Sequence, residues 1–447
     1  MPQGADRGDE TFPCSSFRFG AFSMPFALYL LALVVFVMGT SEFMLAGLVP
    51  DISASFGVSV GTAGLLTSAF AAGMVIGAPA MAALTRRLPV QATLVSCVLV
   101  FALTHVVGAL TRDFTNLLIA RVVAAIANAG FVAAALAAAT RLVAVDAKGR
   151  AVSVLLAGTT VATVAGVPAG ALLGAAYGWQ STFWAVALLC VPAAIGIAAG
   201  LRTSARESSR KAASGSSLRT ELGQLASPRL VLPMLTAALV NAGTFAVLTF
   251  LAPIVTDTAH LGPWWVSVAL VLFGVGSFVG VTVAGRLSDR RPRLVIVAGG
   301  SALVLGWIAL ALSATNPAAL LGLVFAQGAL GFAVGSTLIT RVLYAATDAP
   351  TMAGSYATAA LNVGAVAGPV VASAALGVVP GALGPVWVAV VATATALLIT
   401  VPFLRLIAPA PSGAAGRMRG AAASASESLH GRRDRTVPRA PRTGTRR

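Results

Sequence analysis

Charged residues are scarce in this chain. Asp, Glu, Lys and Arg make up 10% of its 447 residues, and hydrophobic residues make up 57%. Because a soluble globular protein carries roughly 25% charged residues, this chain has too little polar surface for a water-soluble particle of its size. Cysteine is rare as well: Cys14, Cys97 and Cys190 are an odd number and lie far apart, which predicts neither a disulfide framework nor a metal site.

Motifs for enzymatic or ATP-driven chemistry are missing too. The sequence contains no glycine-rich phosphate loop with its lysine, no cluster of metal ligands and no histidine paired with a nucleophile. We therefore expect no enzymatic activity, no cofactor and no metal, and an ion gradient is the default energy source. A membrane receptor or membrane enzyme is disfavoured because no soluble domain or catalytic set accompanies the apolar blocks.

Continuous apolar blocks of about 20 residues, the length that crosses a bilayer core, dominate the chain. They show no alternation of apolar and polar residues, so they predict helices and not the strands of a closed barrel. The expected fold class is an all-α polytopic membrane protein with twelve transmembrane helices. We place the spans at residues 25–49, 61–84, 91–110, 117–140, 151–176, 181–200, 230–253, 264–286, 294–314, 318–340, 354–379 and 385–407.

The net charge of +16 comes mostly from basic residues outside the spans. Nine of the 30 Lys and Arg residues lie in 417–447 and most others lie in short loops, which argues against a nucleic-acid partner. Basic loop residues mark the cytoplasmic side. One set of loops contains Arg86, Arg87, Arg141, Lys148, Arg150, Arg286, Arg290, Arg291, Arg293 and Arg341, whereas the opposite set contains Arg112. This asymmetry predicts a multi-pass plasma-membrane protein, expected as a monomer in the lipid bilayer, with both termini in the cytoplasm.

Five regions follow from these spans. Residues 1–24 form a polar, disordered leader without the basic start and apolar stretch of a signal peptide. Residues 25–200 and 230–407 are the two six-helix halves. Residues 201–229 form a Ser/Gly/Ala-rich cytoplasmic linker, and residues 408–447 form a disordered basic tail.

The two halves are internal repeats. Six residues of the first half recur 203 residues later, across two spans and a turn. One constant offset predicts pseudo-symmetric halves related by an axis along the membrane normal, with a binding site between them near the midplane. The pairs are Pro50 and Pro253, Phe70 and Phe273, Gly73 and Gly276, Gly77 and Gly280, Leu84 and Leu287, and Arg87 and Arg290.

Glu42 is an acidic residue inside the first span. A charged side chain at that depth costs at least about 2.5–3.5 kcal/mol unless it faces water or a partner. Because burial favours the protonated carboxyl, proton uptake and release become possible, as a proton-coupled carrier requires. The alternative is a structural hydrogen bond to Thr40, Ser41 or a neighbouring span.

Three further polar residues lie in or near the spans. Arg121 in the fourth span keeps its charge at neutral pH; it either influences Glu42 from a similar depth without direct contact or is a structural tether to carbonyl groups. Asp51 follows Pro50 at the mouth of the first span and either caps a helix or takes part in the proton path. His105, among apolar residues of the third span, is interpreted as a packing histidine.

Span five carries a conformational motif. Residues 158–170 combine small residues, which allow helices to approach closely, with a proline that bends the helix. We expect Gly166, Pro168 and Gly170 to build a tight contact between the halves that seals one side of the cavity.

The turn after span eight, at residues 285–290, carries a second motif. Asp289 and Arg290 either cap and bridge helices there or lock one conformer electrostatically, and Gly285 begins the turn. The first-half copy, at residues 84–89, contains no acid.

These motifs together resemble the major facilitator superfamily, and more narrowly its twelve-span drug:proton antiporters, over residues 24–407. Residues 285–290 resemble the family's Gly-x-Leu-x-Asp-Arg loop, and residues 48–51 resemble the motif that ends span one. Span five resembles the antiporter motif, with Val167 before the proline where glycine is usual. Arg121 matches the arginine of the span-four motif, which implies a role in proton coupling.

Several segments are similar to the actinobacterial chloramphenicol-resistance exporters of that family. They lie at residues 39–44, 64–70, 127–131, 158–168 and 182–190. The resemblance implies proton-driven export of chloramphenicol or related phenicols by alternating access between the halves. Sugar and nucleoside exporters share the Thr-Ser-Glu-Phe segment, so export of such metabolites stays open, as does uncoupled facilitated transport.

For the substrate site we select polar or aromatic positions on spans one, four and seven and on their repeats. A largely apolar drug with polar handles requires such a lining. Phe245 corresponds to Glu42 under the 203-residue offset, so only the first half carries the acid. The selected residues are Asn128, Asn241, Phe245 and Asn362.

Overall fold

A computed structural model describes residues 26–84, 88–143, 148–200, 223–288, 291–346, 349, 352–379 and 381–407. This part of the chain is helical almost throughout and contains no strand. Eleven of its helices are long and apolar enough to cross a membrane. A shorter apolar helix, α18 (Gly384–Thr400), occupies the place of the expected twelfth span. The predicted fold class, an all-α polytopic membrane protein, is confirmed.

The helices of the first half follow the expected spans, and the fifth span is divided by a π-helix. In chain order the elements are α1 (Phe26–Phe43), α2 (Leu45–Phe56), α3 (Val60–Leu84), α4 (Val90–Leu110), α5 (Phe114–Arg141), α6 (Lys148–Val161), the π-helix η2 (Ala162–Gly166), α7 (Val167–Tyr177) and α8 (Trp179–Gly200).

The second half has the same order of long helices with further short pieces. Its elements are η4 (Gln224–Ala226), α11 (Pro228–Thr249), α12 (Leu251–Pro253), η5 (Ile254–Thr258), α13 (Trp264–Leu287), α14 (Pro292–Leu294), η6 (Val295–Gly299), α15 (Gly300–Ser313), α16 (Pro317–Ala345), α17 (Ala353–Leu376), η7 (Gly381–Leu383), α18 and α19 (Leu404–Ile407). Helix α11 begins two residues before the expected boundary. The predicted leader, the tail and most of the predicted linker lie outside the described residues.

Two of the irregular places in the long helices lie near prolines. Pro50 was expected just beyond the first span, but it lies inside α2, which continues to Phe56. A proline inside a helix cannot donate to the carbonyl four residues earlier and clashes with it, and the first span is interrupted at Met44, six residues before Pro50. Pro168 stands at the start of α7, directly after the π-helix η2.

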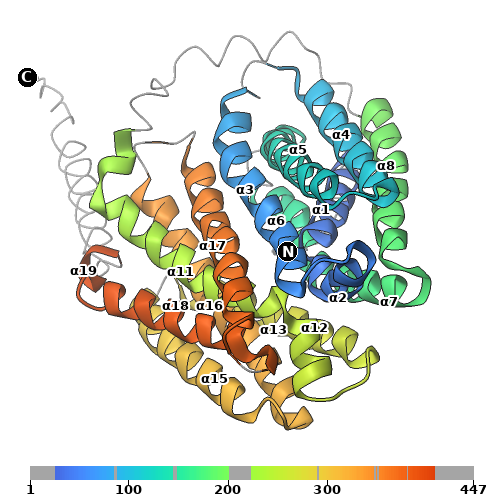
Figure 1. The fold of residues 1–447 in the computed structure, drawn as a ribbon. Coiled ribbons are helices and arrows are strands. Elements are labelled where there is room, and N and C mark those ends of the chain that lie inside the picture. The colour runs from blue at the N-terminus through green and yellow to red at the C-terminus, as the bar shows by residue number, and fades with distance from the viewer. Residues whose placement is uncertain are drawn as a thin grey trace, which may run out of the picture.

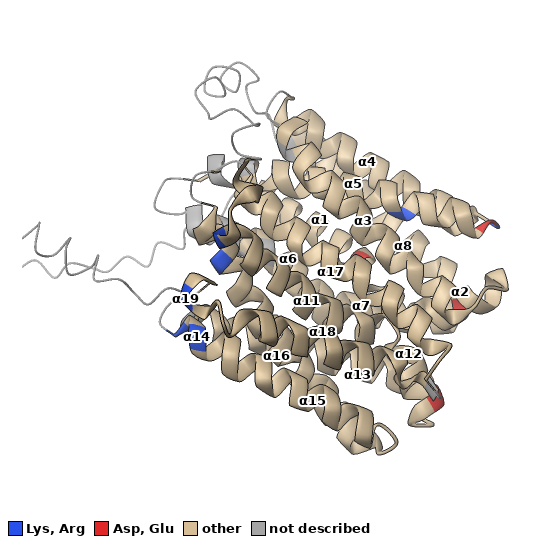
Figure 2. Ribbon diagram, turned by 60° about the vertical axis from the view of Figure 1, so that its left-hand side comes forward, with Lys and Arg blue, Asp and Glu red and all other residues tan. Residues whose placement is uncertain are grey.

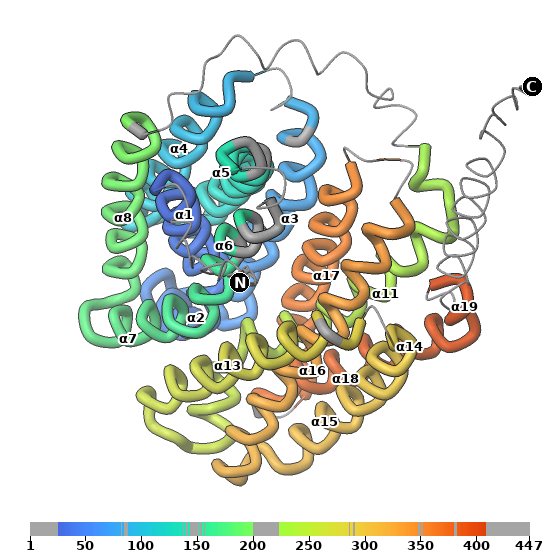
Figure 3. The backbone as a smooth tube through the Cα atoms, turned by 180° about the vertical axis from the view of Figure 1, so that it is seen from behind, coloured from blue at the N-terminus to red at the C-terminus, as the bar shows by residue number. Residues whose placement is uncertain are grey.

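The two halves are separate groups of helices, blue to green and yellow to red in Figures 1 and 3. Their internal packing repeats. Gly73 of α3 lies against the carbonyl oxygen of Val122 in α5, and Gly276 of α13 lies against the carbonyl oxygen of Phe325 in α16. Both the glycines and their partners are 203 residues apart. The predicted internal repeat is therefore a repeat of helix packing, in which glycine allows two backbones to touch.

Two sets of contacts join the halves. Helices α3 and α17 pack along much of their length, with hydrogen bonds from Ser68 Oγ to the Val366 carbonyl (3.0 Å) and from Ser355 Oγ to the Ala78 carbonyl (3.3 Å). On the other side of the molecule, α2, η2 and α7 contact α12 or α13. We call the end where α8 stops and α11 starts the linker end. The second set lies toward the opposite end, so the halves are joined on both sides there.

Charge divides the same two ends. In Figure 2, Lys and Arg gather at the linker end, where α14 and α19 lie, whereas most Asp and Glu lie at the opposite end near α2 and α12. Because basic residues accumulate on the cytoplasmic side of membrane proteins, this distribution agrees with the charge asymmetry that the loop sequences predict.

Packing at Gly280 provides a test of the repeat. A β-carbon there would collide with the backbone carbonyl of Ala329, and backbone can yield only if α13 and α16 separate. We expect Gly280→Ala to lower the unfolding midpoint in detergent, at a cost of about 1–3 kcal/mol, as overpacking usually does. Gly335→Ala is the control, because nothing lies within 4 Å of a carbon added there. Equal losses in both variants would contradict the packing assignment.

Candidate functional site

Three consecutive side chains at the end of α1 meet three different surroundings. Ser41 is fully buried and hydrogen-bonds to residues of α4 and α5. Phe43 packs against Phe245 of the other half, with ring centroids 5.7 Å apart. Glu42 lies between them in sequence and is partly exposed. Since successive residues of an α-helix are turned by about 100°, a single turn of α1 faces both halves.

Arg121 of α5 is almost completely buried, with 1% of its surface exposed. Its Nη1 donates to the Ser41 hydroxyl at 2.9 Å, and its Nη2 donates to the Ser41 backbone carbonyl at 3.0 Å. The guanidinium lies over the ring of Phe70 in α3, with Cζ 4.4 Å from the centroid. These charge-assisted hydrogen bonds and the aromatic face stabilise the buried charge. The Nε atom has no hydrogen-bond partner.

His105 of α4 extends this network. Its Nε2 lies 2.6 Å from Ser41 Oγ, and its Nδ1 lies 2.7 Å from the carbonyl oxygen of Phe101. The ring is buried between Phe101 and Phe183, at centroid distances of 4.3 and 5.6 Å. The interpretation of His105 as a packing histidine is thus incomplete, because both of its nitrogens have polar partners and one of them belongs to the site.

The Glu42 carboxyl has no hydrogen bond or ion pair with any described residue. Its charge interacts with that of Arg121, but Ser41 takes up two donors of the guanidinium. The alternative of a structural hydrogen bond to a neighbour in sequence is not observed, since the Thr40 hydroxyl donates to the Phe36 carbonyl at 2.8 Å. Glu42 is therefore a carboxyl that can gain or lose a proton without breaking an ion pair.

The π-helix η2 lies directly beside this turn of α1. Gly166 abuts Thr40, and a β-carbon on Gly39 would lie 3.1 Å from the β-carbon of Ala162. On its other side, the Thr163 carbonyl abuts Gly274 of α13 in the second half. The element that touches the residues preceding Glu42 therefore also touches the opposite half.

Span five contacts the second half through other residues than its motif predicted. Gly166 packs within the first half, and so does Gly170, whose carbonyl accepts a hydrogen bond from Thr182 Oγ1 at 2.9 Å. Thr163, which the sequence did not single out, makes the backbone contact with the second half, and α7 contacts α13 beyond it. Pro168 lies at the first turn of α7, where its missing N–H coincides with the end of η2.

Three of the four residues selected for the substrate site lie near one another in the second half. Asn241 of α11 donates to the Leu361 carbonyl at 2.7 Å, and the neighbouring Asn362 is 7% exposed. Phe245 lies one turn beyond Asn241 and packs with residues of α1, α3 and α17. Asn128 is in the first half, 4% exposed, with its Nδ2 3.7 Å from a methionine sulfur of α3.

Asp51 is exposed and lies inside α2, so it does not cap that helix. It lines a cavity of about 560 Å³ at the end opposite the linker. The walls come from both halves: α2, α7 and α8 on one side, and α12, η5 and α13 on the other. Asp51 follows Glu42 by nine positions in the chain.

Asp289 and Arg290 of the loop motif lie outside the described residues. At the last described turn of α13, a β-carbon added to Gly285 would have no atom within 4 Å. Arg341 of α16 reaches this turn: its Nη2 donates to the Ser288 carbonyl at 3.3 Å. A basic side chain of span ten therefore holds the end of span eight.

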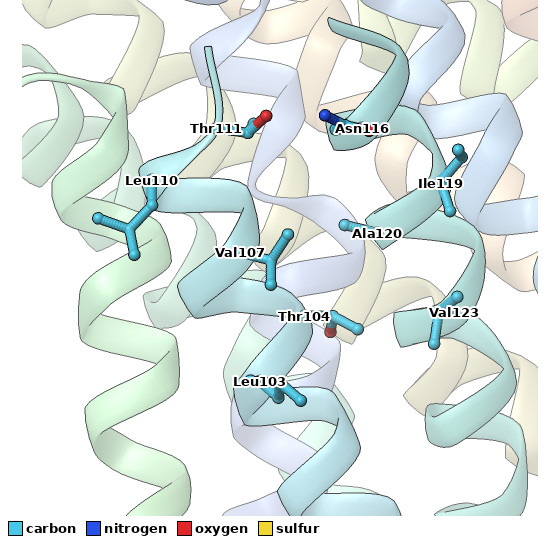
Figure 4. Close-up of a pocket in the computed structure, with 9 residues that line it drawn as sticks. All are labelled: Leu103, Thr104, Val107, Leu110, Thr111, Asn116, Ile119, Ala120 and Val123. Atoms are coloured by element: carbon cyan, nitrogen blue, oxygen red, sulfur yellow. The ribbon is translucent and has the colours of Figure 1, made fainter. Parts of the chain in front are cut away.

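A further hollow, of about 490 Å³, lies between α4 and α5 (Figure 4). Several of its side chains, among them Leu103, Leu110 and Ile119, are more than half exposed on the outer surface of the helix bundle. It contains none of the predicted site residues, and such an apolar wall is what a bilayer contacts. Its lining is Leu103, Thr104, Val107, Leu110, Thr111, Asn116, Ile119, Ala120 and Val123.

The sequence alone does not predict the partners of Arg121. It indicates Ser41 only as a possible hydrogen-bond partner of Glu42 and His105 only as a packing residue, although an ionisable residue inside a span is a functional candidate by default. Within the described ranges, no group of three or more His, Cys, Asp or Glu side chains could hold a metal ion. The arrangement suits the movement of a proton on one carboxyl beside a fixed cation.

Known proteins resemble this chain over most of its length. A "Chloramphenicol resistance protein" of Streptomyces lividans is 61% identical over 394 residues, which cover 88% of this chain and 100% of that protein. The "Inner membrane transport protein YdhP" of Escherichia coli K12 is 30% identical over 84% of this chain and 95% of its own length.

A solved structure shares the fold. The bacterial homologue of the human lysosomal transporter Spinster, in an inward-facing and occupied conformation, matches with a TM-score of 0.66 at 18% sequence identity, over 85% of this chain and 97% of that one. The family model of the Major Facilitator Superfamily matches residues 31–360. With two six-helix halves that repeat the same packing and a family match over most of both, the chain belongs to the Major Facilitator Superfamily.

Proposed function

We propose that this protein exports chloramphenicol and related phenicols across the plasma membrane in exchange for protons. The observation that carries the substrate is the 61% identity with the chloramphenicol resistance protein of Streptomyces lividans over that protein's whole length. The bilayer surrounds the protein, which acts as a monomer.

Proton coupling rests on Glu42. A carboxyl in a transmembrane helix is costly unless it faces water or a partner, and such a residue usually marks a functional site. Glu42 has no ion-pair or hydrogen-bond partner among the described residues. It is partly exposed, lies one residue from the inter-half contact of Phe43 with Phe245, and interacts electrostatically with Arg121. A drug that enters between the halves would displace its proton, and reprotonation would return the carrier.

The linker end is the cytoplasmic side in this proposal, with both termini there. The gathering of basic residues at that end supports this orientation (Figure 2). The halves are joined on both sides at the opposite, outer end, so the described conformation is taken as one in which drug would enter from the cytoplasm or the inner leaflet. Asp51, in the outer cavity, would then accept protons arriving from outside and pass them inward.

The remaining residues complete the cycle. Asn241, which is partly exposed, would contact drug in this conformation, whereas Asn128, Phe245 and Asn362 are almost fully buried and would reach it only after the helices move. Gly285, Asp289 and Arg290 would hold the halves at the cytoplasmic end in the other conformation. Thr163 of η2 and helix α7 would hold them together in this one, while Gly166, Pro168 and Gly170 shape the packing of span five within the first half.

Replacing Glu42 tests the coupling and the substrate together. In a drug-sensitive host, we expect the wild-type chain to raise the inhibitory chloramphenicol concentration several-fold. Glu42→Gln should return it to the host value, because the amide cannot exchange a proton, while Glu42→Asp should keep part of the resistance. Membrane expression is matched by immunoblot.

The outcomes separate the rival functions. No resistance from well-expressed wild type contradicts phenicol export and favours sugar or nucleoside export. Resistance that survives Glu42→Gln unchanged contradicts proton coupling through this carboxyl and favours an uncoupled facilitator.

The contact between η2 and α13 tests alternating access. Gly274→Val would push its side chain into the Thr163 carbonyl, so we expect a looser outer closure and lower resistance at matched expression. A cysteine at Ala252, which is 2% exposed on the cavity wall, should then react faster with an impermeant maleimide in a background with the native cysteines replaced. Gly322→Val, at an exposed glycine with no atom within 4 Å, is the control. Unchanged labelling in Gly274→Val would show that this contact does not close the outer side.

A further inference from the structure

The hydrogen bonds around Ser41 can be assigned a direction. The Phe101 carbonyl can only accept, so His105 Nδ1 carries a proton and donates to it. Arg121 Nη1 can only donate, so it donates to Ser41 Oγ. The Ser41 hydroxyl proton then points to His105 Nε2, which accepts it at 2.6 Å. The result is one continuous chain of donors from Arg121 through Ser41 and His105 to a backbone carbonyl.

This series of hydrogen bonds requires a neutral His105. A doubly protonated ring would donate from Nε2 as well, which would leave the Ser41 hydroxyl proton without its acceptor and bring a second cation to the buried guanidinium. The three side chains are at most 1% exposed, so water does not replace a lost partner. Each bond therefore restrains the next, and the last restrained group is the guanidinium of Arg121.

The restraint on Arg121 matters because the Glu42 carboxyl lies next to Ser41, the residue that binds the guanidinium. Glu42 follows Ser41 directly, and Arg121 has N–H groups to spare, including an unpartnered Nε. If the bond to the Ser41 hydroxyl were lost, Glu42 would be the adjacent acceptor of opposite charge. A direct ion pair favours the ionised carboxyl and opposes proton uptake.

Among the described helices around α1, no other charged residue lies at this level. The described helices packed on α1 are α2, α3, α5, α6, α7, α8 and η2. From the second half, α11 meets α1 at Phe43 and α13 meets η2, and α4 is reached through His105. Their remaining charged residues lie nine residues away on α2 or toward the linker end: Asp51, Arg141, Lys148, Arg150, Arg229 and Arg286.

We propose that Ser41 and His105 are positioning residues that hold the Arg121 guanidinium beside Glu42 but out of an ion pair with it, which leaves the carboxyl free to exchange its proton. This inference rests on the proposed proton-coupled export. It assigns His105 a role through Ser41 and Arg121, without contact with the drug or the exchanged proton.

Drug-induced proton release tests the proposal. Purified full-length protein in weakly buffered detergent solution is mixed with chloramphenicol, and the released protons are measured with an indicator dye over a range of pH. His105→Phe and Ser41→Ala break the chain, so we expect the midpoint of proton release to move to lower pH by about one unit or more, the shift that a close opposite charge produces. His105→Gln, whose amide oxygen can accept from the Ser41 hydroxyl, should stay near the wild-type midpoint.

Thr104→Val is the matched control. Its hydroxyl donates to the same Phe101 carbonyl at 2.7 Å but does not touch Ser41, so loss of that bond should not move the midpoint. Wild-type midpoints in both His105→Phe and Ser41→Ala, or an equal shift in Thr104→Val, would overturn the positioning role. Ser41→Ala, which loses a single hydroxyl, decides the matter if His105→Phe does not fold. A wild-type protein that binds chloramphenicol without releasing protons would instead overturn the proposed coupling, and the positioning role with it.

Discussion

The buried guanidinium of Arg121 constrains four helices of the first half of the protein. An arginine cannot lose its charge at neutral pH, so a site that excludes water must supply acceptors for it. Here the acceptors are the hydroxyl and carbonyl of Ser41 in α1, and the face of Phe70 in α3 adds to them. His105 of α4 holds the Ser41 hydroxyl in turn. One charge on α5 thus fixes the relative positions of four helices.

The second half repeats the packing but not the charge. At the positions equivalent to Glu42 and Arg121, it carries Phe245 and Val324, both buried. Phe245 packs on Phe43, one residue from the carboxyl. The halves therefore share their helix packing but differ in their side chains at this level. The first half holds Glu42 and Arg121, and the second presents an apolar surface to them. Only a relative movement of the halves can change how Glu42 is solvated while the packing inside each half is kept.

Irregular helix gathers at the same level of the molecule. The first span is interrupted at Met44, just after Glu42, and the fifth span becomes the π-helix η2 where it touches Gly39 and Thr40. π-helical turns recur at functional sites because their hydrogen-bond pattern is easily changed. η2 also contacts Gly274 of the other half, so a change in α1 has a short physical route to the interface.

The class of the fold and its symmetry follow from the sequence alone. Spans, halves and the repeat at Gly73 and Gly276 could be predicted because burial in a bilayer needs continuous apolar helices, and close helix contacts need glycine. Glu42 and Arg121 stood out for the same reason, since charge is rare in such helices. Which groups meet, in contrast, depends on tertiary packing. The bonds of Ser41 to residues 64 and 80 positions away and the contact of Thr163 with Gly274 require a particular rotation and depth of whole helices. That geometry is set by packing between segments distant in sequence, which no local pattern of residues records.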